Sequence, residues 1–455
     1  MKKLIVVGII ILLVGMNIPS TGIDVEKFTV SYDGNILYVG GDGPGNYTRI
    51  QDAIDNSSDG DTVFVYEDLS PYYENIIINK SIILVGEDKN TTIIDGRSAG
   101  DIVFINSDEV TVSGFTLQNS GLIWPDSGIR IHYSNETIIM ENILSNNHIG
   151  IQLLFSNNNM VIGNNATDNN RSIYLISSNN NIIQNNTAMD SEHGIWIDFS
   201  SSNSVTGNNA HSNNKNGIIL TTSSNNNFIT DNKVSKNYWG IYLSYSYYNT
   251  ITGNNVSKNY NGISLYSYSN GNKLYHNNFM NNILTVDDDC NNIWNNSYPS
   301  CGNYWDIYIG DDIFWGPNQH MNGSDGIGDN PYDISGSESK DLYPLMEAYG
   351  MTTLSLDFRG GLFKCSGGIK NMGNKTAFNV QWHFIIDGGI IFFGKESSGI
   401  IPKPLLPGEE SYISSHLILG FGSIILTIAI WANNAPYVSF STPGRLLLFY
   451  IKILI

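Results

Sequence analysis

Residues 194–209 read GIWIDFSSSNSVTGNN, and this phrase recurs through the middle of the chain, from residue 128 to residue 282. Each copy opens with a small residue and isoleucine, passes through a polar turn to Asn-x-Ile or Asn-x-Val, and ends near Gly-Asn-Asn. The openings are 22 or 23 residues apart, at Gly128, Gly150, Ser172, Gly194, Gly217, Gly240 and Gly262. A fixed period of this length predicts a solenoid in which each repeat forms one structural unit.

The pattern inside each repeat predicts strands rather than helices. Apolar and polar residues alternate after the openings, as in Ile195-Trp196-Ile197-Asp198 and Ile241-Tyr242-Leu243-Ser244. A period of two residues is typical of a strand, and no stretch of ten or more residues in the repeats carries the helical period. The skeleton of leucine-rich repeats is absent as well. We therefore expect each repeat to be one coil of a parallel β-helix.

Asparagines recur at two fixed distances from the openings, where the coil must turn. Asn tolerates left-handed backbone geometry, and amides stacked ~4.8 Å apart can form a hydrogen-bonded ladder. The first predicted column is Asn159, Asn181, Asn203, Asn227, Asn249 and Asn272, and the second is Asn142, Asn164, Asn186, Asn208, Asn232, Asn254 and Asn277. Aliphatic residues between the columns should stack inside the coil: Ile139, Val161, Ile183, Val205, Ile229, Ile251 and Leu274. Low-complexity disorder, the alternative for so Asn-rich a segment, does not explain this register.

The start and the charge of the chain indicate export. Lys2 and Lys3 precede an apolar run, residues 4–16, that is too short to span a hydrocarbon core of ~30 Å. Residues 1–22 are therefore predicted to be a signal peptide or, alternatively, an N-terminal membrane anchor. The formal net charge of −19 argues against nucleic acid as a partner. We expect a protein that is secreted or held at the cell surface, outside the cytoplasm.

The β-helix is predicted to span residues 30–347. A short helix near residues 48–56, with Thr48 and Gln51 matching a capping box, should cover the open end of the first coil. Irregular coils then lead into the regular coils of residues 128–282, and a closing region follows at 290–347.

The first coils resemble the opening of pectin-lyase-like right-handed β-helix proteins. The resemblance is carried by Ile50-Gln51-Asp52-Ala53-Ile54, Gly60-Asp61-Thr62-Val63 and Leu84-Val85-Gly86-Glu87. It implies that the predicted parallel β-helix is single-stranded and right-handed.

Three closing motifs resemble the NosD-like family, the periplasmic accessory proteins of nitrous oxide reductase. The motifs are Gly302-Asn303-Tyr304-Trp305-Asp306, residues 323–332 (GSDGIGDNPY) and Asp341-Leu342-Tyr343-Pro344-Leu345-Met346. They are also similar to motifs of archaeal-type cell-surface proteins with PbH1-like repeats. Over about residues 30–347 the resemblance implies the β-helix fold, and for the NosD-like family itself a role connected with copper.

Near residue 350 the asparagine columns stop and the composition changes. Short alternating strands, such as residues 380–385 and 424–430, are separated by turns and predict a small Ig-like β-sandwich over 350–455. A membrane helix over 417–432 is the rival interpretation, which the interruption by Gly420-Phe421-Gly422 disfavours. The whole chain is thus predicted to be all-β. Cys290 and Cys301 either close a disulfide loop or remain thiols.

Ionisable residues gather around the opening at Gly194. The candidate catalytic residues are Asp190, Glu192, His193 and Asp198, with Arg171 one coil earlier and Lys215 one coil later by the repeat offset. Carboxylates, an imidazole and cations at one place could perform acid–base chemistry on a sugar, as in a polysaccharide lyase, hydrolase or epimerase. The alternative is a solvated ladder of ion pairs between coils, which stabilises little.

A second candidate is the outward column two residues past each opening, which consists of Arg130, Gln152, Tyr174, Trp196, Ile219, Tyr242 and Ser264. Its rings, Tyr174, Trp196 and Tyr242, could stack against the sugars of a long glycan. The alternative is that they are ordinary strand-forming aromatic residues.

A third candidate is a metal site in the closing region. Asp325, Asp329 and Asp333 lie among glycines, and their oxygens would suit calcium. Alternatively, these side chains cap turns. Copper prefers His or Met ligands, and the close pairs, His276 with Met280 and His320 with Met321, do not resemble a dedicated site, so a copper cofactor is not expected.

These patterns favour a secreted or surface β-helix protein that binds an extracellular polysaccharide or a cell-surface glycoprotein without catalysis. A carbohydrate-active lyase, hydrolase or epimerase is the alternative, and a metal accessory role is the third interpretation. The fold by itself does not choose among them.

Overall fold

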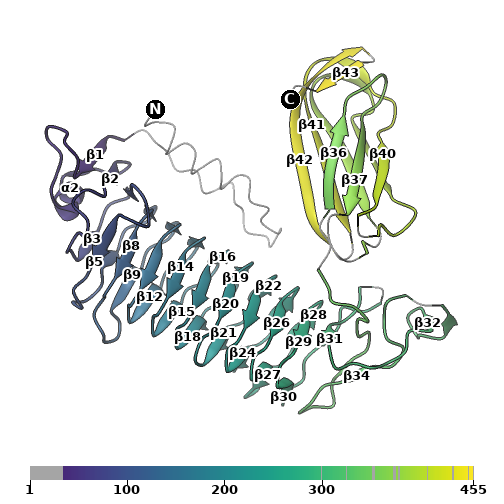
Figure 1. Ribbon diagram of the computed structural model, residues 1–455, viewed down its shortest axis with the longest axis horizontal. Helices are drawn as coiled ribbons and strands as arrows, with labels where there is room; N and C mark the ends of the chain where they lie inside the picture. Colours follow the sequence, from purple (N-terminus) through teal and green to yellow (C-terminus); the bar gives the residue numbers. More distant parts are fainter. Residues whose placement is uncertain are drawn as a thin grey trace. The chain divides into compact units, whose positions relative to one another are not determined.

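The computed structural model describes residues 34–298, 300–323, 325–350, 354–371, 376–377, 380–406, 408–432, 435–448 and 450–453. The chain forms two compact units, which meet in the sequence between Ala348 and Tyr349. The first is a parallel β-helix and the second consists of antiparallel sheets (Figure 1). The predicted all-β fold class is confirmed. The predicted signal peptide or anchor, residues 1–22, lies outside the described residues.

Each coil of the first unit contributes one short strand to each of three parallel sheets, which we call A, B and C. Sheet A contains β1 (Ile36–Val39), β2 (Thr62–Val65), β4 (Ile83–Gly86), β7 (Thr111–Ser113), β10 (Ile138–Met140), β13 (Met160–Ile162), β16 (Ile182–Gln184), β19 (Ser204–Thr206), β22 (Phe228–Thr230), β25 (Thr250–Thr252) and β28 (Lys273–Tyr275). Sheet B contains β5 (Ile93–Asp95), β8 (Thr116–Gln118), β11 (Ile143–Ser145), β14 (Asn165–Thr167), β17 (Thr187–Met189), β20 (Asn209–His211), β23 (Lys233–Ser235), β26 (Asn255–Ser257), β29 (Asn278–Met280) and β31 (Tyr304–Trp305).

Sheet C has the longest strands, six residues each in the regular coils. It contains β3 (Ile76–Ile78), β6 (Val103–Ile105), β9 (Ser127–His132), β12 (Ile149–Leu154), β15 (Arg171–Ile176), β18 (His193–Asp198), β21 (Asn216–Thr221), β24 (Trp239–Ser244), β27 (Asn261–Tyr266) and β30 (Leu284–Asp288). Neighbouring strands of all three sheets stack along the axis of this unit (Figure 1). The longer strands make sheet C the widest outer face available for binding.

The predicted interior column is confirmed. Ile139, Val161 and Ile183 are Cα partners on successive strands of sheet A, and the column continues to Leu274 in the same register. Every member is fully buried. Because inward and outward residues alternate, this register also fixes which side chains face outward on each strand.

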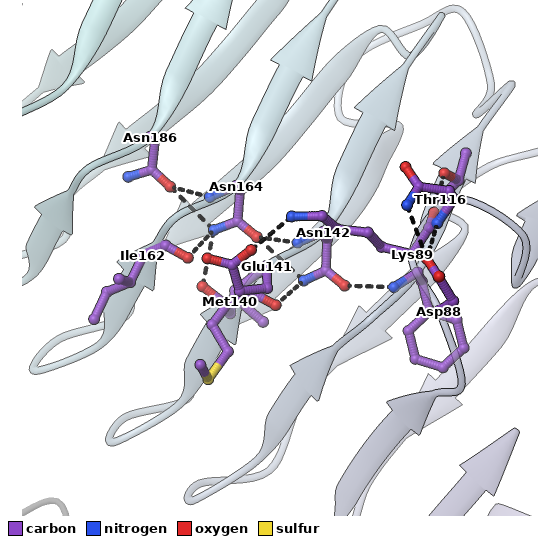
Figure 2. Close-up of polar contacts among 12 residues, drawn as sticks. Asp88, Lys89, Thr116, Met140, Glu141, Asn142, Ile162, Asn164 and Asn186 are labelled. Atoms are coloured by element: carbon purple, nitrogen blue, oxygen red, sulfur yellow. Dashed lines mark hydrogen bonds and ion pairs between the residues drawn. The ribbon is translucent and has the colours of Figure 1, made fainter. Parts of the chain in front are cut away.

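Both predicted asparagine columns are hydrogen-bonded ladders. In Figure 2 the Oδ1 of Asn186 accepts from the backbone N–H of Asn164 (2.9 Å) and from its Nδ2 (3.1 Å). The Nδ2 of Asn186 donates to the carbonyl of Val161 (2.8 Å). The Nδ2 of Asn186 also donates to the Oδ1 of Asn208 in the next coil (3.0 Å), so this side chain joins three consecutive coils. At the corners the backbone N–H and C=O groups lie outside the strands and are buried, so they need other partners. The asparagine amides provide these hydrogen bonds.

A third column was missed by the sequence analysis. It lies nineteen or twenty residues past the openings, between sheets B and C, and consists of Asn147, Asn169, Ser191, Asn213, Asn237, Asn259 and Asn282. Ser191 replaces Asn in one coil and accepts from the N–H of Asn169 through its hydroxyl.

The ladder asparagines do not adopt the expected left-handed backbone. That conformation falls on the preceding residue, for example Gly163 (φ 65°), Gly207 (φ 68°) and Gly253 (φ 69°), which explains the Gly of the Gly-Asn-Asn phrase. The preceding residue turns the corner, so that the asparagine side chain can point into the coil.

The N-terminal end of the β-helix is covered by α2 (Ile50–Asn56), whose apolar face is buried in the core. The predicted capping box is wrong, because Arg49 is the N-cap residue and makes no side-chain cap. Glu74 takes this role from the next coil, accepting from the N–H groups of Ile50 (2.8 Å) and Gln51 (3.1 Å). A carboxylate at this end of a helix also suits the helix dipole.

The opposite end is closed by the predicted closing region. Its small antiparallel pairs are β32 (Phe314–Trp315) with β33 (Met321–Asn322), and β34 (Tyr332–Asp333) with β35 (Lys340–Asp341). Asp341 ends the second asparagine ladder, since its Oδ2 accepts from the backbone N–H of Asn303 (2.7 Å) and from the indole of Trp305 (3.0 Å). Two of the three closing motifs therefore meet at one buried carboxylate.

The second unit has two antiparallel sheets that share one core, as expected for a small sandwich. The three-stranded sheet contains β36 (Leu354–Arg359), β37 (Ser366–Asn371) and β40 (Glu410–Ser414), and the five-stranded sheet contains β38 (Gln381–Phe393), β39 (Glu396–Ile400), β41 (Leu419–Ala432), β42 (Ala435–Leu448) and β43 (Tyr450–Ile453). The rival membrane helix over 417–432 is wrong, because residues 419–432 form strand β41. Within the described chain no helix has the length and apolar character to cross a membrane. Cys290 and Cys301 are not joined in a disulfide.

We predict that the third asparagine column stabilises the β-helix as much as the two predicted ones. Asn213→Ala should lower the free energy of unfolding by roughly 2–4 kcal/mol, because it leaves the N–H of Ser191 and the carbonyl of Ala188 without their partner. The exposed neighbour provides the control, since Asn214→Ala should change stability by less than about 0.5 kcal/mol. Equal urea midpoints for the two variants would contradict the prediction.

We also predict that Asp341 gives the β-helix a characteristic pH dependence. Burial raises the pKa of Asp341 from 3.8 to about 7, against the opposing effect of its hydrogen-bond donors. Because the pKa is higher in the folded than in the unfolded state, its contribution to stability falls as pH rises from ~4 to ~7. The stability advantage of the wild type over Asp341→Asn in urea denaturation should therefore shrink across this window. An advantage that grows with pH would show instead that the donors hold the carboxylate ionised.

Candidate functional site

The outer face of sheet C brings the sequence-predicted residues into columns. The predicted alignment from Arg130 to Ser264 is confirmed, because these residues are successive Cα partners on β9, β12, β15, β18, β21, β24 and β27. Arg171 and His193 are Cα partners as well, at the start of β15 and β18. Their inward neighbours Ile173 and Ile195 are fully buried, so the strands hold this outer surface rigidly.

The three candidate rings do not form one continuous exposed stripe. The Tyr174 and Trp196 rings are adjacent, with centroids 4.9 Å apart, but Tyr174 is buried. Buried Ile219 separates Trp196 from Tyr242. Tyr242 belongs instead to a second aromatic group, 5.8 Å from the rings of both Trp239 and Tyr266.

A loop between β8 and β9 buries Tyr174 and makes a pocket over sheet C. Leu122 and Ile123 are each 72% exposed at its tip, and the Trp124 ring lies edge-on to Tyr174 at 6.0 Å. The pocket has a volume of about 570 Å³, and it is lined by Leu122, Ile123, Trp124, His148, Arg171, Tyr174 and Ile176. Aromatic and apolar walls with a few polar groups are the usual composition of a ligand pocket.

Arg171 supplies the positive charge of this pocket. Its guanidinium lies 5.1 Å from the Tyr174 ring and 5.0 Å from the Trp196 ring, so both aromatic faces attract the cation. His148 also lines the pocket, but burial and the neighbouring Arg171 lower the pKa of its imidazole.

Arg171 and Tyr174, which line this pocket, were predicted from the sequence as site residues, but Leu122, Ile123 and Trp124 were not. Trp124 and its neighbours lie in an irregular coil before the first regular opening. The available signal was composition, because Leu122-Ile123-Trp124 places three consecutive apolar residues at a corner that in the following coils reads Asn146-Asn147-His148 and Asp168-Asn169-Asn170.

The candidate acid–base residues are brought near one another but are engaged with different partners. Glu192 forms an ion pair with Lys215, and both side chains are partly exposed. Asp198 accepts from the hydroxyl of Thr221 (2.7 Å) and lies 3.5 Å from the hydroxyl of Tyr174. Asp190 is exposed at a left-handed corner (φ 51°).

His193 is buried at the centre of this group. Its Nδ1 lies 2.9 Å from the Nδ2 of Asn216, and its ring packs against Trp196 at 4.9 Å. Burial lowers the pKa of His193 to about 4, with Arg171 acting in the same direction and Glu192 opposing it. Burial and the nearby Asp198 raise the pKa of Tyr174 to about 12. Both groups are therefore neutral at physiological pH.

The three aspartates of the predicted calcium site have separate partners. Asp329 accepts from the N–H groups of Ile313 (3.0 Å) and Phe314 (3.1 Å), and Asp325 accepts from that of Ile327 (3.1 Å). Asp333 forms an exposed ion pair with Lys340, at 2.7 Å. In the part of the chain that the structure describes, no three His, Cys, Asp or Glu side chains are grouped to hold a metal ion.

A family model described as "Periplasmic copper-binding protein (NosD)" matches residues 54–233 and 191–310, which together span more than half of the 455 residues. The resemblance to NosD-like proteins is thereby confirmed. No curated protein matches the chain.

Several solved structures are similar. The A-module of mannuronan C-5 epimerase AlgE4 from Azotobacter vinelandii is 14% identical, with 59% of this chain and 94% of that chain covered and a TM-score of 0.42. ORF18 of Geobacillus virus E2 is 13% identical, with 95% and 78% covered and a TM-score of 0.45. The alginate lyase of Paenibacillus sp. str. FPU-7 is 11% identical, with 59% and 97% covered and a TM-score of 0.36. At these values they carry no argument about function.

The described residues do not fit a copper site. The Nε2 of His276 contacts the backbone carbonyl of Ser300, so this ring nitrogen already has a partner within the protein. His320 is exposed in the closing region, and the described chain groups no third His, Cys, Asp or Glu with it. Copper needs several soft or imidazole ligands at one point.

We predict that His193 stays uncharged down to about pH 5. An NMR titration of the imidazole should give a pKa of about 4, because burial disfavours the charged form. Since this pKa lies below the unfolded value of 6.5, acidification from ~6.5 to ~4 should destabilise the wild type more than His193→Gln. A titration near 6.5 would refute the prediction and make His193 a competent general acid or base.

Proposed function

Because this chain belongs to the NosD family, whose description is periplasmic, we propose that it acts outside the cytoplasm as a non-catalytic carbohydrate-binding protein. Its ligand is an extracellular polysaccharide or the glycan of a cell-surface glycoprotein. The binding surface is the outer face of sheet C together with the pocket beneath the 119–126 loop.

The pocket with Trp124, Tyr174 and Arg171 is the observation that supports this proposal. Its volume of about 570 Å³ falls in the range of small-ligand sites. Trp124 is half exposed at the entrance, so its ring can pack against the apolar face of a sugar. Arg171 and the hydroxyl groups of sheet C provide hydrogen-bond donors to sugar oxygens.

The engagement of the acid–base residues supports binding without catalysis. A general acid or base works best with a pKa near the operating pH, whereas the pKa of His193 is about 4 and that of Tyr174 about 12. Glu192 is paired with Lys215, and Asp198 already accepts from Thr221. None of these groups is held ready to exchange a proton with a bound sugar at neutral pH.

A lyase, hydrolase or epimerase is the second candidate. One observation favours it, because the hydroxyl of Tyr174 lies 3.5 Å from Asp198 and the same ring lines the pocket with Arg171. Binding of a sugar that displaced water from this group would change the pKa of both.

We predict that a glycan array will identify a ligand and that Trp124→Ala will weaken its binding at least tenfold, or about 1.4 kcal/mol, because a stacked ring is lost. Phe228→Ala is the matched control, since Phe228 is a partly exposed ring on sheet A. Assays for reducing ends, unsaturated products and changed sugar configuration should detect no turnover. Turnover that disappears in His193→Ala and Asp198→Ala would establish the enzyme instead, and an array without any hit would contradict the proposal.

A further inference from the structure

We infer that the pocket selects sugars that carry a carboxylate, with Arg171 as the group that recognises the anion. The inference rests on the proposed function, because it assumes that the pocket binds a glycan, and it adds the chemical class of the sugar. It depends on Arg171 and on the walls of the pocket.

Arg171 has no carboxylate partner in the described chain, although that chain is strongly acidic. The protein has 42 Asp and Glu residues against 23 Lys and Arg residues, so carboxylates outnumber cations. On the same face Arg130 pairs with Asp101 at 2.5 Å, and Lys215 pairs with Glu192. No described Asp or Glu oxygen comes within ion-pair distance of Arg171, and its buried Nε has no acceptor.

The surroundings of Arg171 hold the guanidinium in place without neutralising it. The rings of Tyr174 and Trp196 lie 5.1 Å and 5.0 Å from the guanidinium, and they attract its charge but satisfy none of its N–H donors. A planar guanidinium with free donors matches the two oxygens of a carboxylate, which it can bind through a pair of parallel hydrogen bonds.

Among the residues that line the pocket, Arg171 carries the positive charge at neutral pH. The pKa of His148 is lowered by burial and by Arg171 itself, so its imidazole is uncharged there. Leu122, Ile123 and Trp124 shield one side from water, which strengthens an ion pair formed inside. A neutral sugar would contact the same rings but would leave the charge of Arg171 unmatched.

A pair of oligosaccharides that differ only at one carbon tests this inference. The probes are a β-1,4-linked oligomer of glucuronic acid and the glucose oligomer of equal length and linkage, measured by titration calorimetry with the full chain. The wild type should bind the acidic oligomer at least tenfold more tightly. Arg171→Gln should weaken the acidic oligomer at least tenfold and the neutral one less than twofold, whereas Arg171→Lys should give an intermediate loss.

Control variants separate the charge from the pocket and from folding. Lys233→Gln removes one exposed cation on sheet B and should leave both affinities unchanged. Trp124→Ala should weaken both oligomers together. Equal binding of the two oligomers, or equal losses for both in Arg171→Gln, would overturn the inference and leave the proposed function intact. Failure of both oligomers to bind would also overturn it, whereas the proposed function falls only if the wider glycan array is blank.

Discussion

The hydrogen bond from one asparagine amide to the next is the interaction on which this β-helix depends. A coil of 22 residues must leave its strands at each corner, and there the backbone N–H and C=O groups lose their partners in the ladder. Asn186 and its counterparts restore these bonds by accepting from the coil before and donating to backbone and amide groups on both sides. Since each amide contacts three coils, a change in the length of one coil would break bonds in its neighbours. This constraint explains why the period holds at 22 or 23 residues.

The candidate binding pocket lies where the chain departs from the regular repeat. The 119–126 loop is one departure, because it adds apolar residues to a corner that elsewhere is short and polar, and it thereby converts a flat sheet into a pocket. Arg171 is another, since its position is occupied by isoleucine, histidine and asparagine in neighbouring coils. The rigid strands beneath hold these side chains in place, which lowers the cost of ordering them around a ligand.

The two ends of the β-helix are closed by carboxylates rather than by more repeats. Glu74 caps the helix that covers the first coils, and Asp341 accepts hydrogen bonds from the end of the second asparagine ladder. Glu74 satisfies N–H groups of the first turn of α2, and Asp341 satisfies the N–H of Asn303, which a further coil would otherwise have bonded. Such closure prevents the open edges of parallel sheets from pairing with another chain. The family likeness carried by the closing motifs thus has a structural basis, because Asn303, Trp305 and Asp341 form a single hydrogen-bonded unit.

The sequence by itself determined the period, the β-strand coil with its buried aliphatic column, two of the three asparagine ladders and the all-β second unit. These features follow from local residue patterns that repeat, so one copy predicts the rest. It also aligned Arg171 with His193 and placed Tyr174 beside Trp196, because register fixes neighbours between coils. Only the tertiary structure decided which of these residues are available. Tyr174 is buried by a loop about 50 residues earlier in the chain, His193 is neutral because of its burial, and the aspartates near 325 are already bonded to backbone N–H groups. Such properties depend on contacts between segments that share no repeat, and no periodic pattern records them.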